Sequence, residues 1–418
     1  MKNKMFAAAL MSCLTAAALV AAPTVRAGNN DYSQTIDSVP VKKYLVVKKG
    51  VFVPNVTFRY TLAPGQAVEA TADTHEIFPG PAGAVFASSG KKYAFASFTP
   101  SDTVTPEADA PDGSTVRFAT SDTSDEEYAE KTLTVDLSGV TFPAAGIYRY
   151  VVTEEDSGLA GITQDSDNKR YIDVFVHKSD QTDDEEYVAG SAVIRLNDGA
   201  PDADGKARAA VKSSGFTNRY DTNNIGFSKS VTGNQASFNQ YFKFTVKLTG
   251  NKKVDESNTL VKVSGEFDEE PAENMATRYD GDVMAAANAG LEYVTLADLR
   301  NGRDFYIKHG QSVELTGIPD GMGYEVSEEK LDYTPSVAVT GDSNGTVEEG
   351  RAMDGSLTED TTLAFTNARN GIIPSTGISA AFALPLAVMA GGIAGIVLLY
   401  VRRIKKKARK GNAIEQAQ

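Results

Sequence analysis

The sequence predicts an all-β chain with two tandem β-sandwich domains. Apolar residues recur at every second position in short segments, as at Val56, Phe58 and Tyr60, which is the pattern of a half-buried strand. Clusters of Gly, Pro, Asp and Asn separate these segments, and only residues 287–301 favour a helical turn before residue 378. Strands of this kind bury their apolar faces by packing as sandwiches.

The same order of motifs occurs twice, which predicts two similar domains. The first copy has the segments 45–49, 150–155 and 216–218, and the second has 225–229, 324–329 and 365–367. We therefore expect domain 1 over residues 41–221 and domain 2 over residues 222–369.

Each copy places a lysine, a glutamate and an asparagine on the apolar face of its strands. The predicted triads are Lys49, Glu154 and Asn218 in domain 1, and Lys229, Glu328 and Asn367 in domain 2. Burial lowers the pKa of a lysine and raises that of a glutamate by up to about 3 to 5 units. A neutral amine can then attack the carboxamide while the protonated glutamate polarises it and shuttles a proton.

Loss of ammonia in that reaction would leave an amide bond between the two side chains. The alternative is a buried ion pair between lysine and glutamate with a hydrogen-bonded asparagine beside it. The presence of two matching triads favours bond formation.

The first 27 residues predict a secretory signal peptide. Two lysines precede an apolar region, and Val25–Ala27 supplies the small residues of a cleavage site. The only cysteine, Cys13, lies inside this segment, so the exported chain would contain no thiol. Covalent cross-links outside the cell would then require chemistry other than a disulfide. Residues 28–40 are expected to form a leader.

The C-terminus combines a short motif, an apolar span and a basic tail. An uncharged run over residues 378–401 is long enough to cross a bilayer, and residues 402–418 form a basic cytoplasmic tail. Residues 370–377 form a predicted stalk whose end is the pentapeptide Ile373, Pro374, Ser375, Thr376 and Gly377. The alternative is an ordinary single-span anchor.

This arrangement resembles the cell-wall sorting signal of Gram-positive surface proteins. The resemblance implies that a sortase attacks the carbonyl of Thr376 and releases everything from Gly377 onward. The partners that follow from it are a sortase and peptidoglycan.

Composition argues against several classes of function. The chain has 41 basic and 55 acidic residues and a net charge of −14, which disfavours nucleic acid as a partner. Its three histidines are scattered, and the acidic loop over residues 197–205 lacks the closing glutamate of a calcium site. We therefore expect no metal and no cofactor, and no hydrolase site is evident.

The segments around the two glutamates, residues 140–155 and 305–328, resemble those of FctA-like streptococcal major pilins. The resemblance implies two Ig-like (CnaB-type) domains, each closed by a Lys–Asn isopeptide bond formed once, without enzymatic turnover. It also implies a secreted, wall-anchored subunit that a sortase joins head to tail with other copies, with minor pilins as further partners.

In that family, a lysine near the end of the first domain accepts the acyl group of the next subunit. Lys212 is the expected acceptor here, and Lys206 is the second choice. A different reading of the chain is a monomeric, wall-anchored adhesin that uses the same internal bonds to resist shear.

Overall fold

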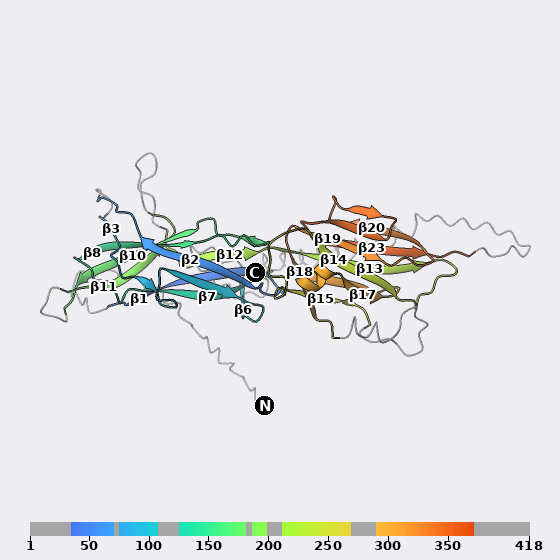
Figure 1. The fold of residues 1–418 in the computed structure, drawn as a ribbon, viewed down its shortest axis with the longest axis horizontal. Helices are drawn as coiled ribbons and strands as arrows, with labels where there is room; N and C mark the ends of the chain where they lie inside the picture. The colour runs from blue at the N-terminus through green and yellow to red at the C-terminus, as the bar shows by residue number, and fades with distance from the viewer. Residues whose placement is uncertain are drawn as a thin grey trace, which may run out of the picture. The chain divides into compact units, whose positions relative to one another are not determined.

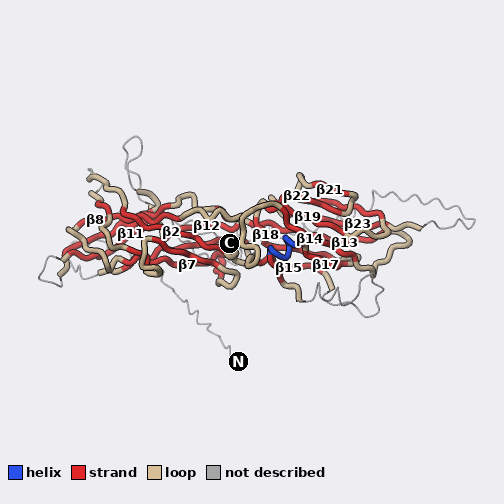
Figure 2. The backbone as a smooth tube through the Cα atoms, in the orientation of Figure 1, coloured by secondary structure: helices blue, strands red, loops and turns tan. Residues whose placement is uncertain are grey.

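The computed structural model describes residues 35–70, 75–107, 125–180, 186–198, 211–268 and 290–371. Almost all of its regular structure is β-strand, and the one helix in these ranges is the short α2 (Leu296–Asn301) (Figure 2). The strands form two groups, β1 to β12 and β13 to β23, each built of two sheets (Figure 1). The predicted all-β fold of two sandwiches is confirmed.

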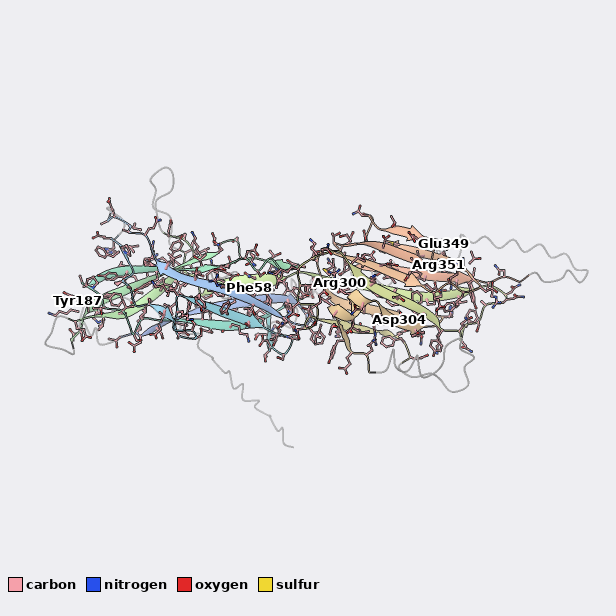
Figure 3. All side chains as sticks on the ribbon, viewed as in Figure 1. Phe58, Tyr187, Arg300, Asp304, Glu349 and Arg351 are labelled. Atoms are coloured by element: carbon pink, nitrogen blue, oxygen red, sulfur yellow. The ribbon has the colours of Figure 1, made fainter. Side chains whose placement is uncertain are left out.

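The first sandwich contains two sheets of six strands. One sheet has, in spatial order, β4 (Val85–Phe86), β7 (Glu126–Asp136), β1 (Ser38–Lys48), β12 (Gly215–Tyr220) and β9 (Ile162–Thr163), with β6 (Val104–Glu107) beside β7. The other has β11 (Tyr187–Arg195), β10 (Lys169–Lys178), β8 (Gly146–Glu154), β2 (Val56–Pro64) and β5 (Tyr93–Phe98), with β3 (Phe78–Pro79) beside β8. Alternate residues of both sheets form one core, in which Phe58 of β2 is fully buried (labelled in Figure 3).

The second sandwich contains sheets of six and five strands. One sheet has β16 (Tyr293–Thr295), β15 (Leu260–Glu266), β18 (Ser312–Pro319), β13 (Thr222–Thr232), β23 (Thr361–Ala368) and β20 (Thr334–Thr340). The other has β17 (Arg303–Ile307), β14 (Phe242–Thr249), β19 (Met322–Glu328), β22 (Ala352–Leu357) and β21 (Thr346–Glu348). A second, separate apolar core fills the space between them.

The first and last strands of each sandwich are parallel neighbours. β1 pairs with β12, and β13 pairs with β23. Each pair lies in one sheet, while β8 and β19, which end at the two predicted glutamates, lie in the opposite sheets. A side chain from each of three strands can therefore meet inside one core.

The start of β1 and the extent of α2 differ from the boundaries that the sequence predicts. β1 begins at Ser38, inside the predicted leader, because Val39 and Val41 already bury their side chains in the core. α2 occupies only the end of the predicted helical region. Thr295 caps it by a reciprocal capping box with Asp298, and Leu296 and Leu299 are its buried residues.

Several predicted segments lie outside the described residues. These are the signal peptide (1–27), most of the leader, Lys206, the sorting motif (373–377), the apolar span (378–401) and the basic tail (402–418). Within the ranges that the structure does describe, α2 is too short to cross a membrane. In those same ranges, no group of three or more His, Cys, Asp or Glu residues is placed to hold a metal ion.

Candidate functional site

The second sandwich brings together the three residues that the sequence singled out there. Lys229 lies on β13, Glu328 ends β19, and Asn367 lies on β23. The Nζ of Lys229 and the Nδ2 of Asn367 each lie 2.6 Å from the same oxygen, Oε1 of Glu328. All three residues are at most 3% exposed. One carboxyl oxygen thus contacts both the amine and the amide nitrogen.

The first sandwich repeats this arrangement with a different lysine. Lys43 of β1 donates from Nζ to both carboxyl oxygens of Glu154, at 2.8 and 3.0 Å. The Nδ2 of Asn218, on β12, donates to Oε1 of the same carboxyl group. Lys43 and Asn218 are fully buried, and Glu154 is 2% exposed. The site therefore consists of Lys43, Glu154 and Asn218.

The prediction that Lys49 points into the core is wrong. Alternation along β1 does turn the odd-numbered residues inward, as predicted, but the strand ends at Lys48. Gly50 adopts a positive φ of 79° in the turn that follows, and Lys49 is exposed there. Lys49 therefore stays outside the core, which the chain re-enters only at Val51 and Val53.

Register explains why Lys43 is the residue that matches Lys229. Lys43 pairs with Phe216, and the next inward residue, Leu45, pairs with Asn218. Lys229 likewise pairs with Phe365, and Val231 pairs with Asn367. A sequence signal was present, because Lys43 and Lys229 both lie inside an alternating strand whereas Lys49 is followed at once by glycine.

Burial shifts both lysines toward the neutral amine. Desolvation lowers the pKa of Lys43 to about 8 and that of Lys229 to about 8, although the neighbouring glutamate in each case opposes the shift. About a tenth of each amine would then be neutral at pH 7. An aromatic ring faces each amine. The Nζ of Lys43 lies 4.2 Å from the ring centre of Phe58, and the Nζ of Lys229 lies 4.3 Å from that of Phe242.

The carboxyl groups have different surroundings in the two sandwiches. Burial raises the pKa of Glu328, against the opposing effect of Lys229. Its Oε2 has no hydrogen-bond partner among the described residues. In the first sandwich the Tyr60 hydroxyl donates to Oε2 of Glu154 at 2.8 Å. Tyr60 pairs with Glu154 on the neighbouring strand, and Phe244 takes the corresponding place beside Glu328.

The first site also includes a polar loop that the sequence analysis did not single out. Gln164 and Asp165 follow β9 and hydrogen-bond the two ends of the Asn218 carboxamide. Arg170, on β10, is fully buried and forms an ion pair with Asp165. No periodic pattern marks these residues, so only their position in the fold reveals them.

The first-choice acceptor, Lys212, lies outside the triad. Lys212 is exposed, precedes β12, and forms an isolated β-bridge with Arg195. Its side chain is therefore not part of the buried triad. Its role as acceptor stays a prediction, as does that of Lys206.

Comparison with known proteins agrees with the motif resemblance. A protein called "Pilin" from Streptococcus pyogenes serotype M1 is 24% identical over 283 residues, covering 65% of this chain and 72% of that protein. This chain resembles the streptococcal major pilins. A second relative, "Pilus tip adhesin Cpa" from Streptococcus pyogenes, is 29% identical over 160 residues, which are 38% of this chain and 18% of the adhesin.

Two further comparisons concern fold and domain. The crystal structure of the major pilin from Streptococcus pyogenes matches with a TM-score of 0.48 and 20% identity, covering 80% of this chain and 99% of that one. A family model described as "Domain of unknown function (DUF7601)" matches residues 223–369.

Proposed function

We propose that this chain is a major pilin subunit in which each sandwich closes itself with a Lys–Asn isopeptide bond. The observation that carries the proposal is the repeated geometry, in which one buried glutamate oxygen contacts both the lysine amine and the asparagine amide. The similarity to a streptococcal protein named as a pilin supports the same conclusion.

The reaction in each sandwich balances without any external reagent. A proton passes from the lysine ammonium to the glutamate carboxylate, which gives a neutral amine and a carboxylic acid. The amine nitrogen then bonds to Cγ of the asparagine. The glutamate delivers a proton to Nδ2 and accepts one from Nζ, and the Cγ–Nδ2 bond breaks with release of ammonia.

The bond would join the first and last strands of its sandwich. β1 and β12, and likewise β13 and β23, are parallel neighbours, so tension on the ends of a domain would load a covalent bond directly. Such a link suits a subunit of a covalent fibre. Both reactions occur once per molecule, so the chain is proposed as a structural protein and not an enzyme.

Intact mass of the purified fragment 28–377 tests the internal bonds. We expect a deficit of two ammonia molecules, of which Glu154→Ala restores one and Glu328→Ala restores the other. An unmodified wild-type mass would refute the proposal.

Assembly and anchoring are the second part of the proposal. A sortase would cut after Thr376, join the subunit through its carbonyl to a lysine of another copy, with Lys212 preferred over Lys206, and finally attach the fibre to peptidoglycan. Wall extracts should then show a ladder of bands that resists boiling in detergent. Thr376→Ala and Lys212→Ala should each abolish the ladder.

The alternative function is a monomeric, wall-anchored adhesin. The relative named as a pilus tip adhesin keeps this reading open, although the matching segment is a small part of that protein. A single wall-linked band in place of the ladder would favour the adhesin over the pilin.

A further inference from the structure

The carboxamide of Asn218 is held at both ends by one loop. The backbone N–H of Asp165 donates to Oδ1 of Asn218 at 2.9 Å, and Nδ2 of Asn218 donates to Oε1 of Gln164 at 3.1 Å. The loop is in place because β9 pairs with β12, with Thr163 opposite Arg219. Gln164 and Asp165 therefore continue along β12 to the level of Asn218.

A buried ion pair fixes the loop. The Asp165 carboxylate accepts from the backbone N–H of Thr217 at 2.8 Å and pairs with the fully buried Arg170. Arg170 also donates to the carbonyl oxygens of Asp167 and Lys169, at 2.6 and 2.9 Å. The guanidinium lies 4.6 Å from the ring centre of Phe216. These contacts leave Asp165 little freedom to move away from Asn218.

The second sandwich lacks this feature. Oδ1 of Asn367 is buried and has no hydrogen-bond partner among the residues that the structure describes. The residue opposite Asn367 on the neighbouring strand β20 is Pro335, which has no N–H to donate. The two carboxamides are thus held by their glutamates in the same way but differ at the carbonyl oxygen.

The carbonyl oxygen is where negative charge develops. When Nζ of the lysine bonds to Cγ, the π electrons of the carbonyl move to Oδ1, and they return when the Cγ–Nδ2 bond breaks and ammonia leaves. A preorganised N–H at hydrogen-bond distance from that oxygen stabilises the tetrahedral intermediate more than the starting amide. Loss of one such donor slows acyl transfer by about 100- to 1,000-fold in enzymes.

We propose that the backbone N–H of Asp165 is the oxyanion donor for bond formation at Asn218, and that the first sandwich therefore closes faster than the second. This inference rests on the proposed function, because it concerns the same reaction. Asp165 acts through its main chain on the reacting atoms, whereas Arg170 is a positioning residue that keeps the loop in place.

The experiment follows both bonds in the same molecules. The full chain is synthesised in a cell-free system, labelled in a short pulse and quenched at intervals after translation ends. Mass spectrometry of proteolytic fragments then quantifies the Lys43–Asn218 and Lys229–Asn367 cross-links separately. In the wild type, the first cross-link should form at the higher rate.

The decisive variant carries the α-hydroxy acid analogue of aspartate at position 165, which replaces the N–H by an ester oxygen and keeps the side chain. Closure of the first sandwich should slow by about 100- to 1,000-fold, while closure of the second is unchanged. The matched control carries the α-hydroxy acid analogue of serine at position 166, which places the same ester in the same loop, keeps the Asp165 N–H and its ion pair with Arg170, and should retain most of the wild-type rate.

Three results would overturn the inference. They are a second sandwich that closes as fast as the first in the wild type, a position-165 ester variant that closes at the wild-type rate, and a position-166 ester variant as slow as the position-165 ester. Failure of the proposed function would look different, because neither cross-link would then form in the wild type.

Discussion

Lys43 pairs with Phe216 in the parallel ladder between β1 and β12, one inward position before Leu45 pairs with Asn218. The lysine and the asparagine are therefore adjacent inward residues on neighbouring strands, and the glutamate of the facing sheet reaches both. In the second sandwich, Lys229 likewise pairs with Phe365, one inward position before Val231 pairs with Asn367. A parallel pairing of first and last strands thus creates the reactive site in each domain.

The register predicts which lysine reacts in the first sandwich. Lys43→Ala should abolish the ammonia loss from that domain, because among the described residues Lys43 supplies the amine that hydrogen-bonds to Glu154. Lys49→Ala is the matched control and should leave the loss intact, since Lys49 is exposed beyond the end of β1. Intact mass distinguishes them. Retention of the bond in Lys43→Ala would show that the assignment is mistaken.

The second bond should contribute strongly to stability. Asn367→Ala removes the cross-link between β13 and β23, and closing a loop of this length is worth about 5 kcal/mol by the estimate used for disulfides. The free energy of unfolding in urea should fall by at least that amount. Asn370→Ala, at an exposed position nearby, should change it by less than about 0.5 kcal/mol. Equal effects of the two substitutions would contradict the prediction.

An unreacted second sandwich should become more stable as pH rises from about 8 to 10.5. In Asn367→Ala the bond cannot form and Lys229 stays titratable, with a pKa lowered by burial to about 8 from an ordinary 10.5. Between these values the unfolded chain binds more protons than the folded chain, so the free energy of unfolding increases with pH, by roughly 3 kcal/mol at most.

Urea titrations at several pH values measure this dependence. Adding Lys229→Met to the Asn367→Ala variant removes the titrating amine and serves as the control. The prediction fails if the double variant shows the same increase.

Tyr60 should stabilise the unreacted first site without being required for the reaction. Burial raises the pKa of its hydroxyl well above the ordinary value, so the group stays protonated and donates to Glu154. In an Asn218→Ala background, Tyr60→Phe should lower the free energy of unfolding by about 1.5 to 3 kcal/mol.

With Asn218 intact, Tyr60→Phe should still lose ammonia, because the second sandwich has Phe244 at the equivalent place. Mass spectrometry checks this outcome. Absence of the bond in Tyr60→Phe would assign the tyrosine a chemical role that the second sandwich lacks.

A separate buried charge cluster should stabilise the first sandwich. Asp173 is fully buried and accepts from Arg149 at 2.6 Å on Oδ1 and 2.8 Å on Oδ2. The Nε of Arg195 lies 2.6 Å from the same Oδ2. Asp173→Ala would leave two arginines without their counterion and should cost about 3 to 5 kcal/mol of stability. Urea unfolding measures the loss.

The control for that cluster is an exposed ion pair on the same sandwich. The Nη1 of Arg59 lies 2.6 Å from Oε1 of Glu155, and the two side chains are 47% and 41% exposed. Glu155→Ala should change stability by less than about 1 kcal/mol, because solvent screens the pair. A loss in Asp173→Ala as small as this would indicate that the buried cluster does not stabilise the fold.

The sequence was sufficient for the second site because Lys229 lies in the middle of a clear alternation between Phe227 and Val231. The first site was harder to predict from the sequence. Lys43 and Lys49 are both odd-numbered, so alternation turns them to the same face, and both have apolar residues two positions away. Gly50 is a signal against Lys49, but the pairing of β1 with β12 decides which lysine lies beside Asn218. These two strands are separated by more than a hundred residues of chain.

Alternation determined the fold class and which side chains face the core within each strand, because a strand turns successive residues to opposite faces. The repeated order of motifs determined that there are two sandwiches. The tertiary structure alone decided which lysine meets Glu154, and it alone placed Tyr60 and the Asp165 N–H around the reacting groups. The physical reason is that side-chain direction is a local property of the backbone, whereas the distance between residues on different strands depends on register and on the packing of two sheets.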